Sequence, residues 1–539
     1  MPALAHAADL VEPQEDPRFI PVATFDDLVR AGKLMVRVGR KQILLLHTER
    51  GVYACNNRCP HEGYPLKQGT VTEGCVLTCN WHNWKFDLAS GATLVGGDTL
   101  RRYPVRIEDG QVCLDLSDPP GPERAAAALA SLKDSFRRLE YDRMAREIAR
   151  LGAAGGDPLE AVRAAIRWTH DHLEFGATHA QAAAPDWLAL RDGLARSEAE
   201  RLVPVTEIVG HLAWDSLREP AYPFPEGVAD YDPEALVEAI EREDEAAAVA
   251  LVRGALRAGL GFADLERPLA QAALAHYADF GHSAIYVVKT GQLIERLGEE
   301  VAEPLVLALV RSLIYAFRED LIPEFRTYGA TLAAWDPARS APPPPAAFRG
   351  LSPKRAMAKC LEGAGAPEAL YDSLLGAVSW QLLRFDTAYE ARSDGPVSRN
   401  VGWLTLTHGV TFANAVRTIC THTPELWPQG LLQIACFVGR NNGFVDPDLD
   451  VAPWRVEAPK TFFQAAGRRQ LDHGQFEYIV ACHQLKLLSA ARDEWTAAPD
   501  APWVPDLLAA VNRFLETPIK RKHTLRTARQ SLDFVALGG

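Results

Sequence analysis

The spacing of apolar and polar residues divides the chain into two regions. In residues 36–46 and 52–55 apolar and polar residues alternate, which is typical of half-buried β-strands. From Glu123 onward Ala, Leu, Arg and Glu dominate, and apolar residues recur at the spacing of an amphipathic helix. Strand signals are scarce in this second region. The pattern therefore predicts a multidomain chain, with a β-rich N-terminal domain followed by a large all-α domain.

Proline-rich stretches mark the expected domain boundaries. Residues 118–122 read Asp-Pro-Pro-Gly-Pro, which is the composition of a stiff linker, and a run of four prolines lies at residues 342–345. The acidic N-terminus lacks the basic stretch of a secretory signal. We predict a mobile N-terminal tail at residues 1–17, a first domain at 18–117 and a linker at 118–124. An all-α domain follows at 125–539, divided into two lobes that meet near 336–353.

Composition narrows the classes of function. The formal net charge of −13 argues against nucleic acid and against an anionic membrane surface as partners. No apolar run approaches the length of a membrane-spanning helix. The nine cysteines show no disulfide framework, which fits a reducing compartment. We therefore expect a cytoplasmic globular protein that binds neither nucleic acid nor membrane.

A paired motif of cysteine and histidine carries the clearest chemistry. Residues 59–61 read Cys-Pro-His and residues 79–82 read Cys-Asn-Trp-His, so each segment supplies one thiolate and one imidazole. A Rieske [2Fe–2S] centre needs two cysteines on one iron and two histidines on the other. A structural zinc site is the alternative, but zinc fingers usually pair Cys with Cys and His with His. The motif predicts a [2Fe–2S] cofactor held by Cys59, His61, Cys79 and His82.

The sequence around this motif resembles the Rieske ferredoxin family over about residues 18–117. Residues 19–23, Phe-Ile-Pro-Val-Ala, open the resemblance, and residues 109–112, Asp-Gly-Gln-Val, lie near its end. The resemblance implies a small β-sandwich with the cluster at one tip, so that electrons enter and leave through His61 or His82. Rieske proteins of the respiratory and photosynthetic complexes carry two further cysteines where this chain has Tyr64 and Trp81, which implies the lower-potential, oxygenase-associated type.

A Rieske cluster only transfers electrons, so the reacting centre must lie elsewhere. In ring-hydroxylating oxygenases the cluster supplies a mononuclear iron held by two histidines and one carboxylate. Only His276 and His282 have suitable spacing, and no Asp or Asn lies three residues before His276. The helical periodicity of the sequence after residue 123 also differs from the mixed α+β fold of the catalytic domain in that class. A standard Rieske ring-hydroxylating oxygenase is therefore kept as an alternative.

The helical region resembles a different family. Residues 408–411 read His-Gly-Val-Thr, residues 170–172 read His-Asp-His, residues 280–285 read Phe-Gly-His-Ser-Ala-Ile and residues 481–483 read Ala-Cys-His. In this order they resemble the motifs of the questin oxidase-like family, and the resemblance covers about residues 125–535. It implies O2-dependent oxidation, by monooxygenation or Baeyer–Villiger-type ring opening, of a bulky aromatic or polyketide-like substrate.

Four histidines in separate helical segments are candidate metal ligands. Helix bundles build metal sites from side chains that point inward from facing helices, and histidine is the commonest metal ligand. We predict that His172, His282, His408 and His483 converge on a non-haem iron, with other histidines in reserve. The reserve ligands are His170, His179, His211 and His422.

We therefore expect a Rieske-coupled oxygenase in which the cluster passes electrons to a histidine-bound iron in the helical domain. The chain has no Gly-x-Gly-x-x-Gly segment in a βαβ setting, so the electrons must come from an external reductase or ferredoxin. The further alternatives are a metal-free oxidase, a haem-binding helical domain and a redox-sensing interaction protein without turnover. The sequence leaves the oligomeric state open and assigns no catalytic residue beyond the metal ligands.

Overall fold

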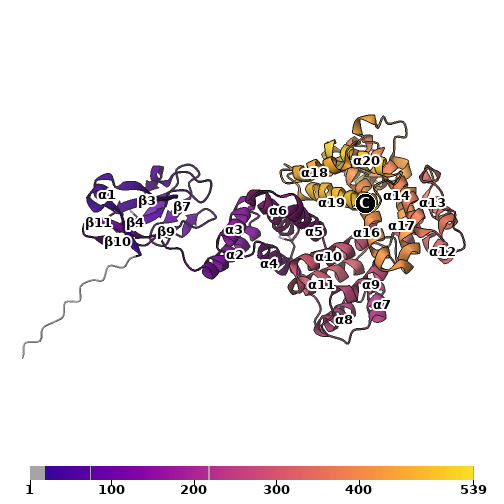
Figure 1. The fold of residues 1–539 in the computed structure, drawn as a ribbon, viewed down its shortest axis with the longest axis horizontal. Helices are drawn as coiled ribbons and strands as arrows, with labels where there is room; N and C mark the ends of the chain where they lie inside the picture. Colours follow the sequence, from indigo (N-terminus) through magenta and orange to yellow (C-terminus); the bar gives the residue numbers. More distant parts are fainter. Residues whose placement is uncertain (1–17, 73, 217–218, 538–539) are drawn as a thin grey trace, which may run out of the picture. The chain divides into compact units, whose positions relative to one another are not determined.

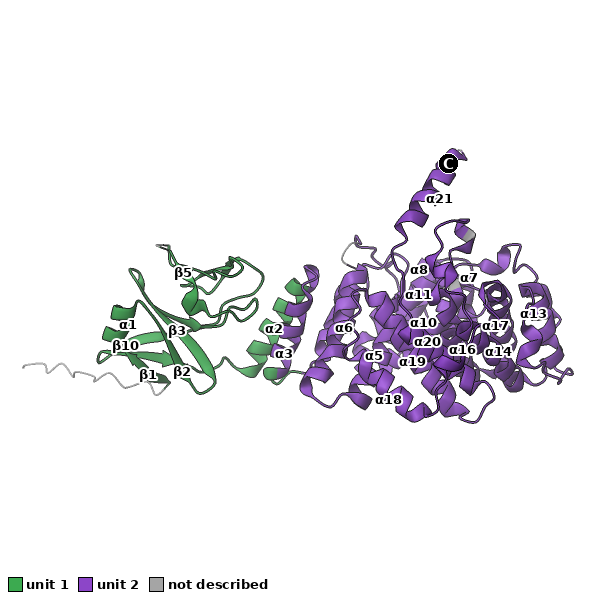
Figure 2. Cartoon of the chain, turned by 90° about the horizontal axis from the view of Figure 1, so that it is seen from above, with its two compact units in different colours: residues 1–135, 153–156 green, residues 136–152, 157–539 purple. Residues whose placement is uncertain are grey.

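The computed structural model describes residues 18–72, 74–216 and 219–537. The predicted N-terminal tail, residues 1–17, lies outside the described residues. Contacts divide the chain into two compact units, Met1–Ser135 with Ala153–Gly156 and Phe136–Gly152 with Asp157–Gly539. Figure 2 colours them separately, and Figure 1 shows the strands in the first part of the chain and the helices after it.

The strands of the described residues belong to three antiparallel sheets. Their orders are β1-β11-β10, β2-β3-β4-β9 and β5-β6-β7-β8. One short helix, α1, follows β1. The bounds are β1 (Phe19–Thr24), α1 (Phe25–Ala31), β2 (Lys33–Val38), β3 (Lys41–Thr48), β4 (Gly51–Asn56), β5 (Thr70–Val71), β6 (Val76–Thr78), β7 (Lys85–Asp87), β8 (Thr93–Val95), β9 (Arg102–Tyr103), β10 (Val105–Glu108) and β11 (Gln111–Asp115).

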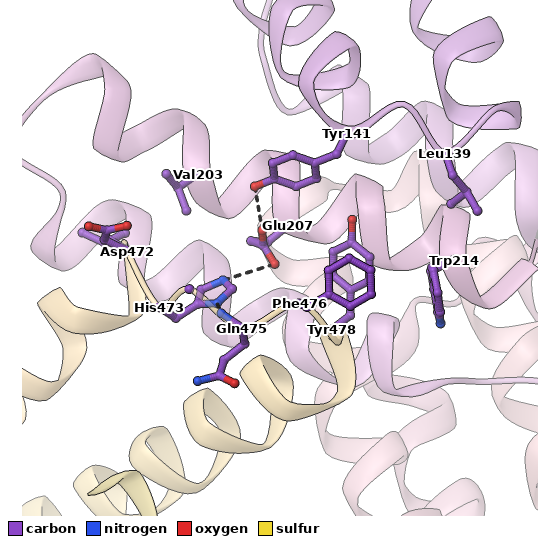
Figure 3. A pocket seen from close by; sticks show the side chains of 12 residues that line it. Leu139, Tyr141, Val203, Glu207, Trp214, Asp472, His473, Gln475, Phe476 and Tyr478 are labelled. Atoms are coloured by element: carbon purple, nitrogen blue, oxygen red, sulfur yellow. Dashed lines mark hydrogen bonds and ion pairs between the residues drawn. The ribbon is translucent and has the colours of Figure 1, made fainter. Parts of the chain in front are cut away.

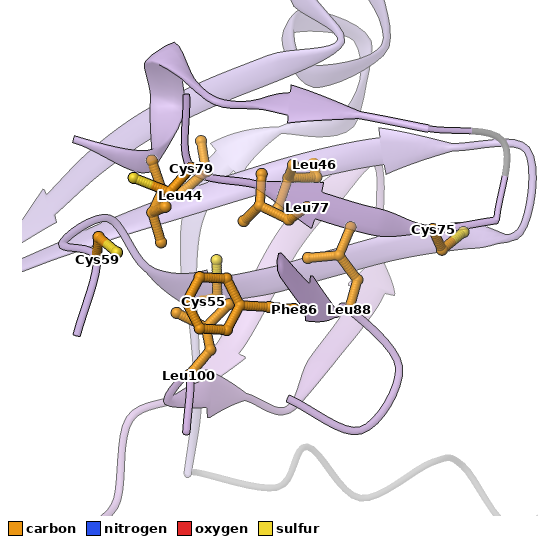
Figure 4. Close-up of a cluster of buried hydrophobic side chains, with 11 residues drawn as sticks. Leu44, Leu46, Cys55, Cys59, Cys75, Leu77, Cys79, Phe86, Leu88 and Leu100 are labelled. Atoms are coloured by element: carbon orange, nitrogen blue, oxygen red, sulfur yellow. The ribbon is translucent and has the colours of Figure 1, made fainter. Parts of the chain in front are cut away.

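The β2-β3-β4-β9 sheet is the middle layer of this domain. Ile43 and Leu45 of β3 belong to one buried group with residues of α1 and β11. Leu44 and Leu46 point to the other face, where they belong to a second buried group with Leu77, Cys59 and Cys79 among others (Figure 4). The prediction of half-buried strands was therefore wrong for β3, because its continuous run of four apolar residues is buried on both faces. The β-rich domain itself is confirmed.

After β11 the described elements are helical, with one isolated bridge between Phe385 and Val445. The helices are α2 (Gly121–Arg137), α3 (Tyr141–Ala153), α4 (Glu160–Thr169), α5 (His179–Leu194), α6 (Glu198–Ser216), α7 (Pro233–Glu241), α8 (Glu245–Arg257), α9 (Phe262–Ala273), α10 (His282–Leu297), α11 (Ala302–Ile314), α12 (Tyr328–Ala333), α13 (Pro353–Cys360), α14 (Pro367–Leu383), α15 (Ala388–Ala391), α16 (Trp403–His422), α17 (Trp427–Asn441), α18 (Pro459–Gln470), α19 (Tyr478–Ala497), α20 (Val504–Glu516) and α21 (Thr524–Ala536). The predicted all-α region is confirmed.

The structure bears on the predicted boundaries in two places. Helix α2 begins at Gly121, inside the stretch expected to be a linker, because Pro122 occupies the first turn, where proline is well tolerated. The proline-rich stretch 336–353, where the sequence predicted two lobes to meet, lies inside the second compact unit. Phe348 is fully buried, and Asn442 Nδ2 donates hydrogen bonds to the carbonyls of Phe348 and Leu351 at 2.9 Å each.

No helix within the described ranges combines the length and the apolar composition that crossing a membrane requires.

Candidate metal centres

The two Cys/His loops of the β-rich domain have the same backbone structure. In each loop the cysteine carbonyl accepts a hydrogen bond from the residue four positions on, Gly63 at 2.8 Å and Asn83 at 2.9 Å. In each loop the cysteine N–H donates to the carbonyl five positions on, at 2.9 Å for Cys59 and 2.8 Å for Cys79. Gly63 and Asn83 have positive φ of 76° and 59°, which Gly and Asn tolerate best. The same turn therefore positions one cysteine and one histidine twice.

The four side chains of the loops converge. The Nδ1 atoms of His61 and His82 lie 3.0 Å apart, and their rings meet edge to face with centroids 4.6 Å apart. Cys59 and Cys79 are only 2% and 1% exposed, whereas the His61 side chain is 32% exposed. Burial, reinforced by the neighbouring Cys79 thiol, raises the pKa of the Cys59 thiol to about 12, so a cation is needed to hold the thiolate. Two buried sulfurs beside two facing imidazole nitrogens fit a [2Fe–2S] cluster of the Rieske type.

Aromatic rings pack around the two histidines. His61 stacks on Trp84 and His82 on Trp81, each with centroids 4.7 Å apart. Trp81 also contacts Tyr64, with centroids 5.4 Å apart. Tyr64 and Trp81 occupy the two positions at which Rieske proteins of the respiratory and photosynthetic complexes carry cysteines. Their ring contact therefore links the two loops. All nine cysteines of the chain are free thiols in the structure.

Replacing His61 or His82 with cysteine is expected to abolish the Rieske EPR signal and lower the reduction potential. A thiolate adds negative charge where a neutral imidazole stood, which disfavours the reduced cluster. EPR with redox titration measures both effects, and the wild-type midpoint is expected near the negative end of the Rieske range, about −150 mV. A wild-type midpoint well above zero would contradict the oxygenase-associated type.

In the helical region four helices form a closed ring around a second group of histidines. Helix α5 packs on α10, α10 on α16, α16 on α19, and α19 on α5. Each of them contributes one histidine. His179 and His282 are the first residues of α5 and α10, and His408 and His483 lie in the second turns of α16 and α19. We call these four residues the histidine quartet.

The Nε2 atoms of the quartet face one another. His282 Nε2 lies 3.2 Å from His179 Nε2 and 3.0 Å from His408 Nε2, which in turn lies 3.3 Å from His483 Nε2. The Nδ1 atom of His408 is 2.5 Å from the Leu404 carbonyl, and that of His483 is 2.7 Å from the Ile479 carbonyl. Because a carbonyl only accepts, both Nδ1 atoms must carry the proton. The Nε2 lone pairs of these two rings therefore point into the quartet.

Burial disfavours the charged form of three histidines of the quartet. It lowers the pKa of His179, His408 and His483 well below the usual histidine value, and the neighbouring histidines and Lys486 act in the same direction. His282, His408 and His483 are buried, whereas His179 is partly exposed. Neutral imidazoles are the form that binds metal ions.

Ligand atoms of His179, His408 and His483 lie within 4.8 Å of one another, close enough to fit one metal ion, and His282 Nε2 lies beside two of them. Nitrogen ligands about 2.0–2.1 Å from a shared ion lie about 2.8–3.4 Å from their neighbours, which brackets the observed separations. Facing lone pairs at such distances repel one another unless a cation lies between them. The Lys486 amine, one helical turn beyond His483, is also fully buried and has no hydrogen-bond partner among the described residues. An unpaired buried amine beside the quartet is costly and indicates that a further group belongs there.

A second polar contact lies deeper in the same ring of helices. Lys289 Nζ is 2.8 Å from Asp186 Oδ1, and both side chains are largely buried. These residues stand seven positions after His282 and His179, respectively. Helices α5 and α10 therefore run in the same direction, and their positive N-terminal ends both lie at the quartet.

The structure brings together three of the four predicted ligands, His282, His408 and His483, and adds His179 from the reserve. The prediction of His172 as a ligand needs correction. His172 lies in the turn between α4 and α5, where its side chain is 38% exposed, 3.4 Å from the Glu219 carbonyl and 3.7 Å from Asp171. The alanine-rich helix that begins at His179 was the available signal, since the start of a buried helix orients its first side chain inward.

The other reserve histidines have partners elsewhere. His170 stacks on Phe224, His211 faces Asp215, and His422 faces Glu266. His276, which the spacing paired with His282, lies between Asp320, 2.9 Å from Nδ1, and Glu241, 3.0 Å from Nε2. Because these carboxylates occupy opposite sides of its ring, His276 and His282 do not form the iron site of a ring-hydroxylating oxygenase.

Replacing His276 with glutamine is expected to destabilise the fold at pH 6 but hardly at pH 9. The hydrogen bond to Asp320, and then that to Glu241, raises the pKa of His276. A raised pKa gives stability that is fully present below the unfolded value, about 6.5, and is lost as the pH rises through the folded value. Melting temperatures of both proteins at the two pH values measure it. An equal difference in melting temperature at pH 6 and pH 9 would show that the charge of His276 does not contribute to stability.

The two loops and their ligands define a Rieske-type iron–sulfur domain. The family model described as Rieske [2Fe-2S] domain matches residues 18–103. A ferredoxin component of an alkene monooxygenase system from Xanthobacter autotrophicus is 30% identical over 108 residues, which are 20% of this chain and 88% of the relative. A ferredoxin component of a naphthalene 1,2-dioxygenase system from Pseudomonas putida is 31% identical over 102 residues, which are 19% of this chain and 97% of the relative. The chain therefore belongs to the Rieske [2Fe-2S] family through its N-terminal domain.

A third relative carries the domain within a longer enzyme. The 4beta-methylsterol monooxygenase of Methylococcus capsulatus is 36% identical over 96 residues, which are 16% of this chain and 26% of the relative. Electron transfer by a [2Fe–2S] cluster is thus the chemistry of residues 18–103. Because these matches cover a fifth of the chain or less, the role of the helical region is argued from its own residues.

Proposed function

We propose that this chain is a Rieske-coupled oxygenase whose helical region binds a non-haem iron between His179, His282, His408 and His483. The observation that carries the proposal is the set of four Nε2 atoms at 3.0–3.3 Å from their neighbours. Iron bound there would accept electrons from the cluster and activate dioxygen. The substrate is an aromatic or polyketide-like small molecule, and the reaction is a monooxygenation or a ring opening, as the resemblance to the questin oxidase-like family implies.

The chain's own residues prepare this site. The carbonyls of Leu404 and Ile479 hold two of the rings in the tautomer that leaves Nε2 free. Burial of His282, His408 and His483 excludes water from three sides, and the partly exposed His179 leaves one side for small reactants. Imidazole ligands suit zinc, copper, nickel and iron alike, so the donor set alone does not select the metal. The electron-transfer domain on the same chain favours iron, because zinc has no redox chemistry.

The electron source is a separate protein in this proposal. The Rieske relatives named above are themselves components of oxygenase systems, and this chain carries no dinucleotide-binding motif. A reductase or ferredoxin would reduce the cluster through the exposed edges of His61 and His82. The seven cysteines other than Cys59 and Cys79 form no disulfide in the structure, which favours a reducing cytoplasm as its compartment.

Metal analysis of the purified full-length protein tests the proposal. We expect about three iron atoms per chain but only about two acid-labile sulfides, since the cluster accounts for two of each. Two irons matched by two sulfides would leave the quartet without iron and would overturn the proposal in favour of a metal-free oxidase. One zinc per chain beside a full cluster would also overturn it, and a Soret band would identify a haem protein.

A further inference from the structure

A cavity in the helical region has aromatic walls. Its volume is about 510 Å³, within the range of small-molecule sites. Figure 3 shows the rings of Tyr141, Trp214, Phe476 and Tyr478 around it, contributed by α3, α6, the loop before α19 and the first residue of α19. Phe476 is 89% exposed, so its ring is largely in water until something stacks on it. Such walls favour a flat, apolar ligand.

One buried carboxylate gives the cavity a polar side. Glu207 of α6 is only 5% exposed. The Tyr141 hydroxyl donates to its Oε1 at 2.7 Å, and His473 Nε2 lies 3.4 Å from its Oε2 (Figure 3). The Gln475 backbone N–H donates to His473 Nδ1 at 3.0 Å, so in a neutral ring Nε2 carries the proton and points it at Glu207. The Tyr141 hydroxyl and the His473 ring thus both face Glu207 as donors, and its carboxyl oxygens accept.

The charge of the lining selects the kind of ligand. Asp472 adds a second carboxylate, and the residues that line the cavity in the described part of the chain include no Lys or Arg. An anionic ligand would be repelled there, whereas a hydroxyl or an ammonium group would find an acceptor. Aromatic rings beside a carboxylate also attract organic cations.

The cavity adjoins the helix that carries one ligand of the quartet. Tyr478 is five residues before His483 on α19, which corresponds to about 7.5 Å along the helix axis. The His211 ring of α6 stacks on Tyr478 with centroids 5.3 Å apart and planes 11° apart. A Cβ added to Gly210 would lie 2.3 Å from the Tyr478 hydroxyl, so glycine is needed to keep this ring in the wall. A ligand stacked on Tyr478 would lie against the same helix that carries His483.

We infer that this cavity binds the substrate as a planar aromatic ring that carries a hydrogen-bond donor, a hydroxyl or an ammonium group, which Glu207 accepts. That the ligand is the substrate rests on the proposed function. The binding itself rests only on the aromatic walls, on the carboxylate and on the absence of a cation from the described lining.

Calorimetric binding of four naphthalene derivatives to the full-length protein tests the inference. Naphthol and naphthylmethylamine carry a donor, whereas methoxynaphthalene carries none and naphthoate is an anion. We expect the better of the two donor compounds to bind at least about tenfold more tightly than methoxynaphthalene and naphthoate. Only the donor compounds can donate a hydrogen bond to the Glu207 carboxylate. The order of naphthol and naphthylmethylamine distinguishes a phenolic from a cationic substrate.

Glu207→Gln is the decisive variant, and Glu198→Gln, at the exposed start of the same helix, is its matched control. We expect Glu207→Gln to weaken the donor compounds about tenfold and the control to leave them unchanged. Phe476→Ala, on an exposed loop where folding is not at risk, should weaken all four compounds together. Equal binding of donors and methoxynaphthalene, unchanged binding in Glu207→Gln, or no binding of any compound at millimolar concentration would overturn the inference.

The same titration in a His408→Ala background separates this inference from the proposed function. Loss of iron there should leave naphthol binding in place. A protein that binds the donor compounds but contains no third iron would refute the iron site alone, and one with the third iron but no binding would refute the cavity alone.

Discussion

The His408→Ala variant is expected to lose the iron of the helical region and to keep an unchanged Rieske spectrum. His408 Nε2 is the central donor of the quartet, 3.0 Å from His282 Nε2 and 3.3 Å from His483 Nε2. Its removal deletes one metal bond outright, and even changes around a ligand typically cost about 10–100-fold in affinity. The [2Fe–2S] ligands lie in another domain, so the cluster should persist. Iron and sulfide analysis with EPR on the same sample measures both effects.

The matched control for this variant is His172→Ala. The sequence predicted His172 as a ligand, but the structure places it in a partly exposed turn beside Glu219 and Asp171. We expect this variant to retain its full iron. A stable His408→Ala protein with all its iron would show that His408 is only a core residue. Loss of such a residue lowers the free energy of unfolding by about 1–3 kcal/mol.

The Gly281→Ala variant is expected to destabilise the helical region and to disturb the quartet. Gly281 has a φ of +80° and directly precedes His282. A Cβ at this position would lie 2.2 Å from Cδ2 of Phe412, four residues after His408 on α16. The positive φ costs an alanine about 1–2 kcal/mol, and forcing extra volume into a packed core costs about 1–3 kcal/mol more. Because either α10 or Phe412 must move, His282 should also leave its position and iron occupancy should fall.

The control for this variant stands at the other end of the same helix. Gly298 has a φ of +96°, and a Cβ there would meet nothing within 4 Å. Gly298→Ala should therefore show only the cost of its backbone conformation, φ 96° and ψ 166°, without a steric clash and with iron content unchanged. Urea denaturation and iron analysis compare the two variants. Equal stability and equal iron in both would mean that the contact with Phe412 does not position His282.

The Rieske loops show what a local motif can predict. Residues 59–82 predicted the ligands because each cysteine and histidine belongs to one tight turn, whose geometry depends on its own few residues. The repeated hydrogen bonds around Gly63 and Asn83 confirm this local origin. Strand β3 was less predictable. A run of four apolar residues indicates burial, but only the packing of a sheet on each face made both sides of the strand part of a core.

The quartet shows where sequence reasoning stops. His172 and His179 are seven residues apart, and both precede or begin a predicted helix. Which of them faces His282 depends on how α5 packs between α10 and α19. The alanine-rich start of α5 indicates burial but does not identify the partner helix. The aromatic cavity is still less predictable, since its walls come from residues as far apart as Tyr141 and Tyr478.

The sequence by itself determined the order of a β-rich and an all-α region and the presence of a Rieske-type motif, and it predicted three of the four histidines of the quartet. These features rest on periodicity and short motifs, whose physics acts over a few neighbouring residues. Only the tertiary structure decided that His179 joins the quartet and that Glu207 lies in an aromatic cavity. Each of these depends on side chains brought together by the packing of distant helices, and the energy of such packing belongs to the assembled fold rather than to any segment.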